Sequence, residues 1–315
     1  MTIYTLVHQT SGGRTGHKMK DFLTAYCLYF LFNWKIMYDE TWKKHPTENH
    51  HDNHCDMFNL TNSKLAICFD SYKHKNFKVV TLNKTSWVGL AIEDILEIKK
   101  NVERVNGENI IIKIVNATRI SPHQLYNWGY KKEYFLLIET LKQLYDTNVN
   151  SLCIKRKFNV QPNNISITVH IRKGDVYNRY PHVNIDYYKN IILRLSKHFD
   201  NKLHTFNIIS EKWHGYDEKD VRSLKNLNLS RNSTINIYMD FCLYEYFDEF
   251  INSDVLVLTN GQGSYSDLSI LYSKQSSYIL LCKKLRHYVF NDTLNNRFIY
   301  CNEDGSFDNS LLLTV

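Results

Sequence analysis

Apolar residues along this chain form short runs that alternate with longer amphipathic stretches. The short runs predict β-strands at residues 3–7, 35–38, 78–82, 109–115, 165–169, 205–211, 234–238, 254–259 and 278–282, the last clear strand. Apolar residues at helical spacing predict helices at 18–33, 92–102, 131–145, 187–199, 217–224, 244–253 and from 266 to about 272, with a loop beginning at Ser121-Pro122. Strands that alternate with helices are typical of α/β proteins with parallel sheets.

One polar stretch interrupts this alternation near the middle of the chain. Residues 155–164 are polar and contain Pro162. The chain has 315 residues, enough for two domains that each bury a core. We therefore expect a first domain at 1–157 and a second at 158–315.

The first strand of the second domain ends in charged residues. The run Ile165–Val169 continues into His170-Ile171-Arg172-Lys173-Gly174-Asp175. In open α/β sheets ligands bind at the carboxyl ends of strands, where an arginine fork and a lysine suit a diphosphate. The alternative is a basic strand end with a surface salt bridge, and spacing alone leaves both open.

Three further stretches place glycine or polar residues after a predicted strand. They are Ser11-Gly12-Gly13-Arg14-Thr15-Gly16-His17, Ile208-Ile209-Ser210-Glu211 and Gly261-Gln262-Gly263-Ser264-Tyr265-Ser266. Glycine-rich turns before a helix can hold phosphate on backbone N–H groups. A plain turn or a charged loop residue is the alternative in each case.

These stretches, in this order, resemble the fucosyltransferase superfamily. His-x-Arg-x-Gly-Asp after an apolar strand resembles its donor-binding motif, and Gly12–His17 resembles its opening glycine-rich loop. The resemblance implies an α/β protein with two Rossmann-like domains facing a cleft, GT-B-like, with the acceptor on the first domain and the nucleotide sugar on the second. It also implies inverting transfer of L-fucose from GDP-fucose to a glycan hydroxyl, without a metal or a cofactor.

The resemblance further implies roles for individual residues. Arg172 would bind the β-phosphate and stabilise the departing GDP, and His170 would lie near the guanine. Supporting roles at the nucleotide or the cleft fall to Lys173, Ser210, Glu211, Gln262, Ser264, Tyr265, Gly13 and Arg14. Asp175, His17 and Glu211 are the candidate general bases. Here Lys173 stands where many relatives have a second arginine, and Gly261–Ser264 replace a serine-rich block.

Charge leaves several classes of function open. The net charge of +7 is spread along the chain, which suits an anionic ligand such as a nucleotide sugar. Nucleic acid is not an expected partner, because the charges are interspersed and no reader motif is present, but a nucleic-acid-binding protein stays an alternative. Transfer from a nucleotide sugar other than GDP-fucose stays open, as does a carbohydrate-binding protein without catalysis. The sequence does not indicate the oligomeric state.

Metal binding and membrane anchoring are not expected. The stretch His45–Asp56 is rich in His and Asp but is polar, contains Pro46 and lacks a second ligand pair, which favours a solvated loop. Seven cysteines without a CxxC motif indicate reduced thiols. With no signal peptide or membrane span in the sequence, we expect a cytoplasmic protein.

Overall fold

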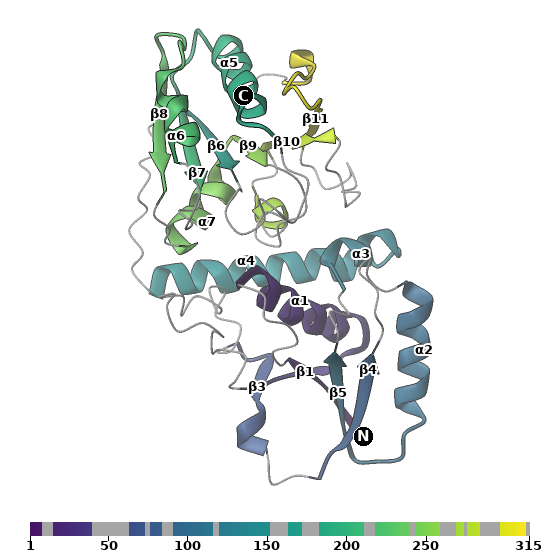
Figure 1. Ribbon diagram of the computed structural model, residues 1–315. Helices are drawn as coiled ribbons and strands as arrows, with labels where there is room; N and C mark the ends of the chain where they lie inside the picture. Colours follow the sequence, from purple (N-terminus) through teal and green to yellow (C-terminus); the bar gives the residue numbers. More distant parts are fainter. Residues whose placement is uncertain are drawn as a thin grey trace. The chain divides into compact units, whose positions relative to one another are not determined.

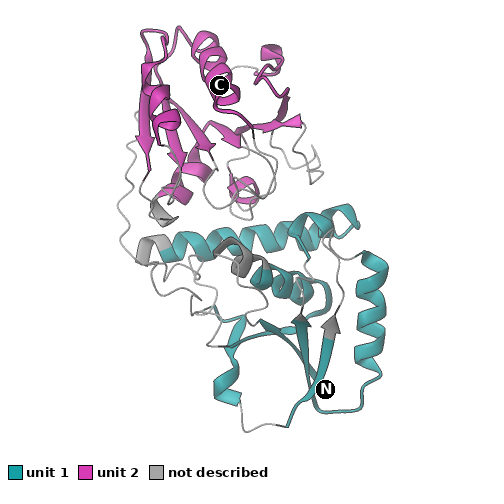
Figure 2. Ribbon diagram, in the orientation of Figure 1, with its two compact units in different colours: residues 1–153 teal, residues 154–315 magenta. Residues whose placement is uncertain are grey.

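The computed structural model divides the chain into two compact units, Met1–Cys153 and Ile154–Val315 (Figures 1 and 2). The residues that the structure describes are 1–7, 15–39, 63–72, 76–83, 91–115, 120–151, 163–171, 183–210, 218–239, 243–258, 269–273, 276–283 and 297–312. Each unit is an α/β unit built on a parallel sheet, as the sequence predicts. The expectation that the two domains face a common cleft stays a prediction.

Unit 1 contains a five-stranded sheet in the order β3-β2-β1-β5-β4. Every described pairing within it is parallel. The strands are β1 (Thr2–Val7), β2 (Lys35–Tyr38), β3 (Ala66–Cys68), β4 (Lys78–Asn83) and β5 (Asn109–Val115). The helices are α1 (Thr15–Phe32), α2 (Ile92–Glu103), α3 (Pro122–Asn127) and α4 (Lys131–Ser151), and a 3-10 helix spans Phe69–Tyr72.

Helix α1 forms much of the core of unit 1. Its residues Phe22, Ala25 and Tyr26 are fully buried, and the helix packs against β1, β2, α3 and α4. The run of residues from 22 to 32 is apolar around most of the helix, which is typical of a helix covered on more than one side. Parallel pairing of β1 with β2 requires a crossover connection, and α1 provides it.

The predicted loop at Ser121-Pro122 is wrong, because these residues begin helix α3. Ser121 precedes the helix, and its backbone N–H donates to the Gln124 side chain over 2.7 Å. Pro122 occupies the first turn, where its missing N–H costs no intrahelical hydrogen bond and its fixed φ suits a helix. The Ser-Pro pair is therefore a helix start here.

Unit 2 contains a six-stranded sheet in the order β11-β10-β9-β6-β7-β8. The described pairings are all parallel. The strands are β6 (Ile165–Ile171), β7 (His204–Ser210), β8 (Ser233–Tyr238), β9 (Val255–Leu258), β10 (Tyr278–Cys282) and β11 (Arg297–Cys301). The helices with described bounds are α5 (Ile185–His198), α6 (Lys219–Ser223) and α7 (Leu243–Asn252), with 3-10 helices at Leu224–Asn226 and Asn309–Leu311. Residues 269–272 are also helical, at the end of the helix predicted from 266 to about 272.

Strand β11 corrects the prediction that 278–282 is the last strand. Arg297-Phe298-Ile299-Tyr300-Cys301 pairs with β10 in register, from Tyr278 opposite Arg297 to Cys282 opposite Cys301. The run is aromatic and β-branched, which favours a strand, but an Asn-rich polar stretch precedes it in the sequence. Pairing with β10 gives this short segment its partner, so tertiary context decides its structure.

The two faces of the unit 2 sheet bury different sets of side chains. Ile165, Ile167, Val169 and Ile171 lie in one cluster with the apolar face of α5. On the other face, Leu256 and Ile279 lie in a cluster with Tyr246 and Phe250 of α7. Burial on both faces is why the strands of this unit read as nearly continuous apolar runs.

Candidate functional site

The candidate site is the carboxyl edge of the unit 2 sheet. Strands β6, β7 and β9 run parallel, so their carboxyl ends meet at one edge. The strands that follow β6 in the sequence, β7 and β8, lie on one side of it in the sheet. The later strands, β9, β10 and β11, lie on its other side. Open α/β sheets bind ligands beside the strand where the order reverses, which here is the end of β6 next to β9.

The structure describes three of the predicted site residues. His170 and Ser210 lie at the carboxyl ends of β6 and β7, and His17 lies in the first turn of α1, where only the backbone is described. The remaining candidates lie outside the described residues: Gly13, Arg14, Arg172, Lys173, Asp175, Glu211, Gln262, Ser264 and Tyr265. Arg172 follows Ile171 directly, so the chain reaches it from the last residue of β6.

His170 is a buried residue, only 4% exposed. Its ring meets the Phe250 ring edge-on, with centroids 5.2 Å apart and planes at 84°. Phe250 belongs to α7 and is itself fully buried. The ring of His170 therefore extends from the end of β6 and packs against α7. Its contact with the Phe250 ring favours one orientation of the imidazole.

Ser210 joins the ends of two strands. Its side chain is fully buried, and its hydroxyl donates to the carbonyl oxygen of Ile171 over 2.8 Å. The bond spans β7 and β6 at the last residue of each strand. It therefore fixes the backbone from which Arg172 continues.

Below this edge, the face of the sheet covered by α7 carries a buried carboxylate that the sequence pattern did not indicate. Glu249 of α7 is 4% exposed. Its Oε1 accepts from Ser166 Oγ at 2.8 Å, from Asn207 Nδ2 at 2.5 Å and from Thr168 Oγ1 at 3.3 Å. Burial raises the pKa of Glu249 above its ordinary value of 4.5, and the three hydrogen bonds oppose that rise.

This network connects α7 to the two strands that carry His170 and Ser210. Thr168 Oγ1 also lies 2.5 Å from Ser253 Oγ, which in turn donates to the Glu249 carbonyl. The signal in the sequence is the alternation of Ser166 and Thr168 with isoleucines inside a buried strand. Buried polar side chains of this kind need partners from another element, so they mark where a polar residue of a helix must pack.

Asp254 connects two strands at the opposite edge of the sheet, where the strands begin. Its carboxylate accepts from the Ser166 backbone N–H at 2.9 Å, and its own N–H donates to the Ser166 carbonyl at 2.9 Å. Ser166 stands near the start of β6, and Asp254 directly precedes β9. Asp254 therefore ties the amino-terminal ends of these strands together, away from the carboxyl edge.

The described ranges contain neither a metal centre nor a membrane span. Within them, no group of three His, Cys, Asp or Glu side chains is placed to hold a metal ion, and the His45–Asp56 stretch lies outside them. Of the helices that the structure describes, none combines the length and the apolar character that crossing a bilayer needs.

Comparisons with known proteins give one weak structural similarity to report. No family model matches the sequence, and no curated protein matches it at a significant level. A solved structure of a mutant of Arabidopsis thaliana fucosyltransferase FUT1 in complex with GDP is similar to this chain, with 11% identity and a TM-score of 0.46. The similarity covers 94% of this chain and 72% of that one.

Proposed function

We propose that this protein is a glycosyltransferase that transfers L-fucose from GDP-fucose to a glycan hydroxyl. The observation that carries the proposal is the strand order β11-β10-β9-β6-β7-β8 together with the residues that follow its central strands. The diphosphate-binding stretch Arg172–Asp175 follows β6, and the glycine-rich stretch Gly261–Ser264 follows β9. Those two strands flank the point at which a parallel sheet of this order binds its ligand.

The proposed chemistry is a single displacement with inversion. The acceptor oxygen forms a bond to the anomeric carbon of the sugar as the bond from that carbon to the β-phosphate oxygen breaks. GDP leaves with the bonding electron pair, and Arg172 stabilises the negative charge that develops on its diphosphate. One of Asp175, His17 and Glu211 takes the proton of the acceptor hydroxyl.

The described residues contribute contacts at the end of β6, the strand that the donor stretch follows in the sequence. The hydrogen bond from Ser210 to Ile171 and the packing of His170 on Phe250 fix the end of β6. A rigid strand end lowers the ordering cost of Arg172 when a nucleotide binds. The contacts of Ser210 and His170 therefore support the choice of this strand end as the place where the diphosphate binds.

Titration calorimetry with GDP, GDP-fucose and UDP tests the proposal. We expect GDP and GDP-fucose to bind and UDP to bind more weakly. Arg172→Ala should weaken GDP binding about tenfold to a hundredfold, the loss of hydrogen bonds to a charged group. Arg231→Ala is the matched control, because Arg231 is an exposed arginine in the turn that precedes β8 at the amino-terminal edge.

Two outcomes would redirect the proposal. Equal binding of UDP and GDP, lost in Arg172→Ala, would indicate a transferase with another nucleotide sugar. Absence of nucleotide binding by the folded wild-type protein would overturn the transferase. Salt-dependent binding to DNA or RNA would then support a nucleic-acid-binding protein.

A further inference from the structure

We propose that Cys282 and Cys301 are a redox-sensitive pair that forms a disulfide and ties the outermost strand β11 to β10. Both side chains are fully buried, and the structure holds both as thiols. They are the last residues that the two strands pair in register. Neither has a part in the proposed transferase chemistry, so this inference does not depend on that function.

The register of the two strands places the cysteines side by side. Cys282 lies directly opposite Cys301, and β10 and β11 run parallel. Opposite residues of a parallel pair point to the same face of the sheet, and their strands are about 4.8 Å apart. A disulfide joins residues whose Cα atoms are about 4.4–6.8 Å apart, so the backbone spacing allows the bond.

The residues around the two thiols show that both lie on the α5 side of the sheet. Cys282 and Cys301 belong to the buried cluster that contains the apolar face of α5. The residues before them, Leu281 and Tyr300, lie with the cluster on the other face. The pKa of Tyr187, an α5 residue in the cysteines' cluster, is raised first by burial and then by the two thiols close to it. Both sulfur atoms therefore share one site under α5.

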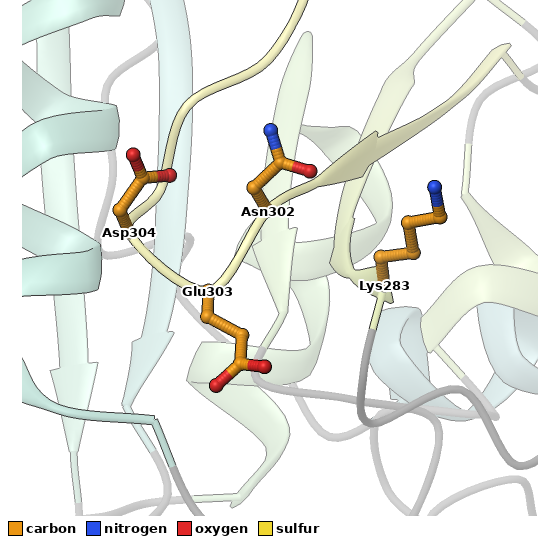
Figure 3. Close-up of a pocket in the computed structure, with 4 residues that line it drawn as sticks. All are labelled: Lys283, Asn302, Glu303 and Asp304. Carbon is orange, nitrogen blue, oxygen red and sulfur yellow. The ribbon is translucent and has the colours of Figure 1, made fainter.

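The cysteine pair lies one residue away from solvent. Lys283 and Asn302 follow the two cysteines directly, are exposed and leave neighbouring strand ends (Figure 3). They line a pocket of about 600 Å³ at the carboxyl ends of β10 and β11. The end of a strand ladder opens more readily than its centre, so local unpairing at the end of β11 exposes both thiols.

Burial controls how fast the pair reacts. The thiolate is the attacking species in disulfide exchange. Burial raises the pKa of the Cys301 thiol to about 12, and Cys282 adds to the rise. The closed pair is therefore unreactive at neutral pH, and exchange proceeds through molecules in which the end of β11 has opened. We expect the rate to increase at urea concentrations that leave the protein folded.

The oxidant is a small-molecule disulfide. The thiolate of one cysteine attacks a sulfur atom of the oxidant, breaks its S–S bond and releases one thiol. The thiolate of the other cysteine then attacks the mixed disulfide, forms the bond between Cys282 and Cys301 and releases the second thiol. The pair loses two electrons and two protons, which the oxidant carries away as two thiols.

The bond stabilises more than the two strands, because β11 leads directly into a turn that packs on α5. Gly305 of this turn has φ of +79°, and a Cβ added there would clash with the carbonyl oxygen of Tyr187. Asn190 of α5 donates from Nδ2 to the Asp304 carbonyl over 2.7 Å. A disulfide also restricts the unfolded chain by closing the loop 283–300. Oxidation therefore raises the stability of unit 2.

Tryptic mapping of the full chain without a reducing agent tests the inference. The protein is incubated with mixtures of oxidised and reduced glutathione, in buffer and in urea below the unfolding midpoint. We expect peptides 275–283 and 298–315, which carry one cysteine of the pair each, to become joined within one chain. The joined peptides should be absent in Cys282→Ser and in Cys301→Ser. They should form as in the wild type in Cys68→Ser, the control in β3.

Thermal unfolding measures the effect of the bond. The oxidised wild-type protein should melt about 4 °C or more above the reduced protein. Cys301→Ser should melt at the same temperature under both conditions. Circular dichroism of each variant checks that the fold is intact, and the wild-type peptide map decides the question even if a variant does not fold.

Three results would overturn the inference. The first is a pair that stays unlinked at every ratio of oxidised to reduced glutathione, in buffer and in urea. The second is glutathione attached to Cys282 or Cys301, or a bond from either to another cysteine, in place of the joined peptides. The third is joined peptides without a rise in melting temperature, since β11 would then not be stabilised.

Discussion

At the residue scale, the two described side chains of the candidate site make structural contacts with neighbouring elements. Ser210 donates its hydroxyl to Ile171, and His170 packs on Phe250, so both hold the end of β6 rather than reach out from it. The sequence predicted polar side chains at these strand ends. It could not predict their partners, because the bond from Ser210 joins residues 39 positions apart and depends on the register of two strands.

Ser210→Ala should destabilise the protein by about 1 kcal/mol, because it removes a buried hydrogen bond to a carbonyl at the strand end. Urea unfolding followed by circular dichroism measures this change. Ser223→Ala is the control, since the Ser223 hydroxyl donates to the Asp220 carbonyl at an exposed site. Equal losses in the two variants would contradict the role given to Ser210.

His204 gives unit 2 a pH-dependent stability. Its Nδ1 donates to the Lys202 carbonyl at 2.8 Å, so the neutral ring accepts from Ser233 Oγ through Nε2 at 2.6 Å. Burial lowers the His204 pKa below its ordinary value of 6.5. The unfolded chain therefore binds the proton more tightly than the folded one, so the free energy of unfolding falls as pH drops below 6.5.

Urea unfolding between about pH 5 and 8 tests this dependence. The wild-type protein should lose stability on the acid side of that range, and His204→Gln should lose less, since glutamine does not titrate. Parallel curves for wild type and His204→Gln would show that this ring does not cause the dependence.

At the element scale, hydrophobic pattern predicted those strands that are buried on both faces. Strands such as β6 and β9 are continuous in apolar character because helices cover both sides of the sheet. The pattern missed the three-residue strand β3. It also missed α3, where a Ser-Pro pair is a helix start, and β11, which is short and follows a polar stretch. For these last two the reason can be stated. In both cases the deciding interaction is a capping bond or a strand pairing that composition does not reveal.

The turn after β11 depends on its glycine. Gly305→Ala should destabilise the protein by at least about 1–3 kcal/mol, because alanine is strained at positive φ and its Cβ would meet the Tyr187 carbonyl. Thermal unfolding measures the loss. In Gly107→Ala the nearest atom to the new Cβ is 3.8 Å away, so that variant should be close to wild type. If both variants unfolded alike, the close approach to α5 would not matter for stability.

At the scale of the whole molecule, each unit has a sheet and a buried core of its own. Leu137 of α4 and Ile191 of α5 are both fully buried, one in each unit. Replacing either with alanine leaves a cavity and should cost about 2–5 kcal/mol. We expect Leu137→Ala to lower the melting temperature of one calorimetric transition, and Ile191→Ala that of another. A single transition that both variants shift equally would mean that the units unfold together.

The predicted domain boundary and most of the predicted site residues fall in stretches of the sequence without regular apolar spacing. The polar stretch at 155–164 predicts a boundary between residues 157 and 158, and the two compact units divide between Cys153 and Ile154. Most candidate site residues follow a predicted strand in the sequence and lie outside the described residues, in stretches where apolar spacing predicts neither a helix nor a strand.

The central place of β6 in its sheet also determines how the chain can be assembled during synthesis. β7 and β8 follow β6 closely in the sequence. As they emerge from the ribosome, β7 can pair with one side of β6, and β8 can then pair with β7. The other side of β6 pairs with β9, which comes much later in the sequence. Asp254, directly before β9, is 88 positions from Ser166, its hydrogen-bond partner in β6. Until that length has been translated, β6 has an open edge with unpaired backbone groups, which invites pairing with other chains. Slow translation before β9 would therefore lower the yield of folded protein, and a chaperone that covers this edge would restore it.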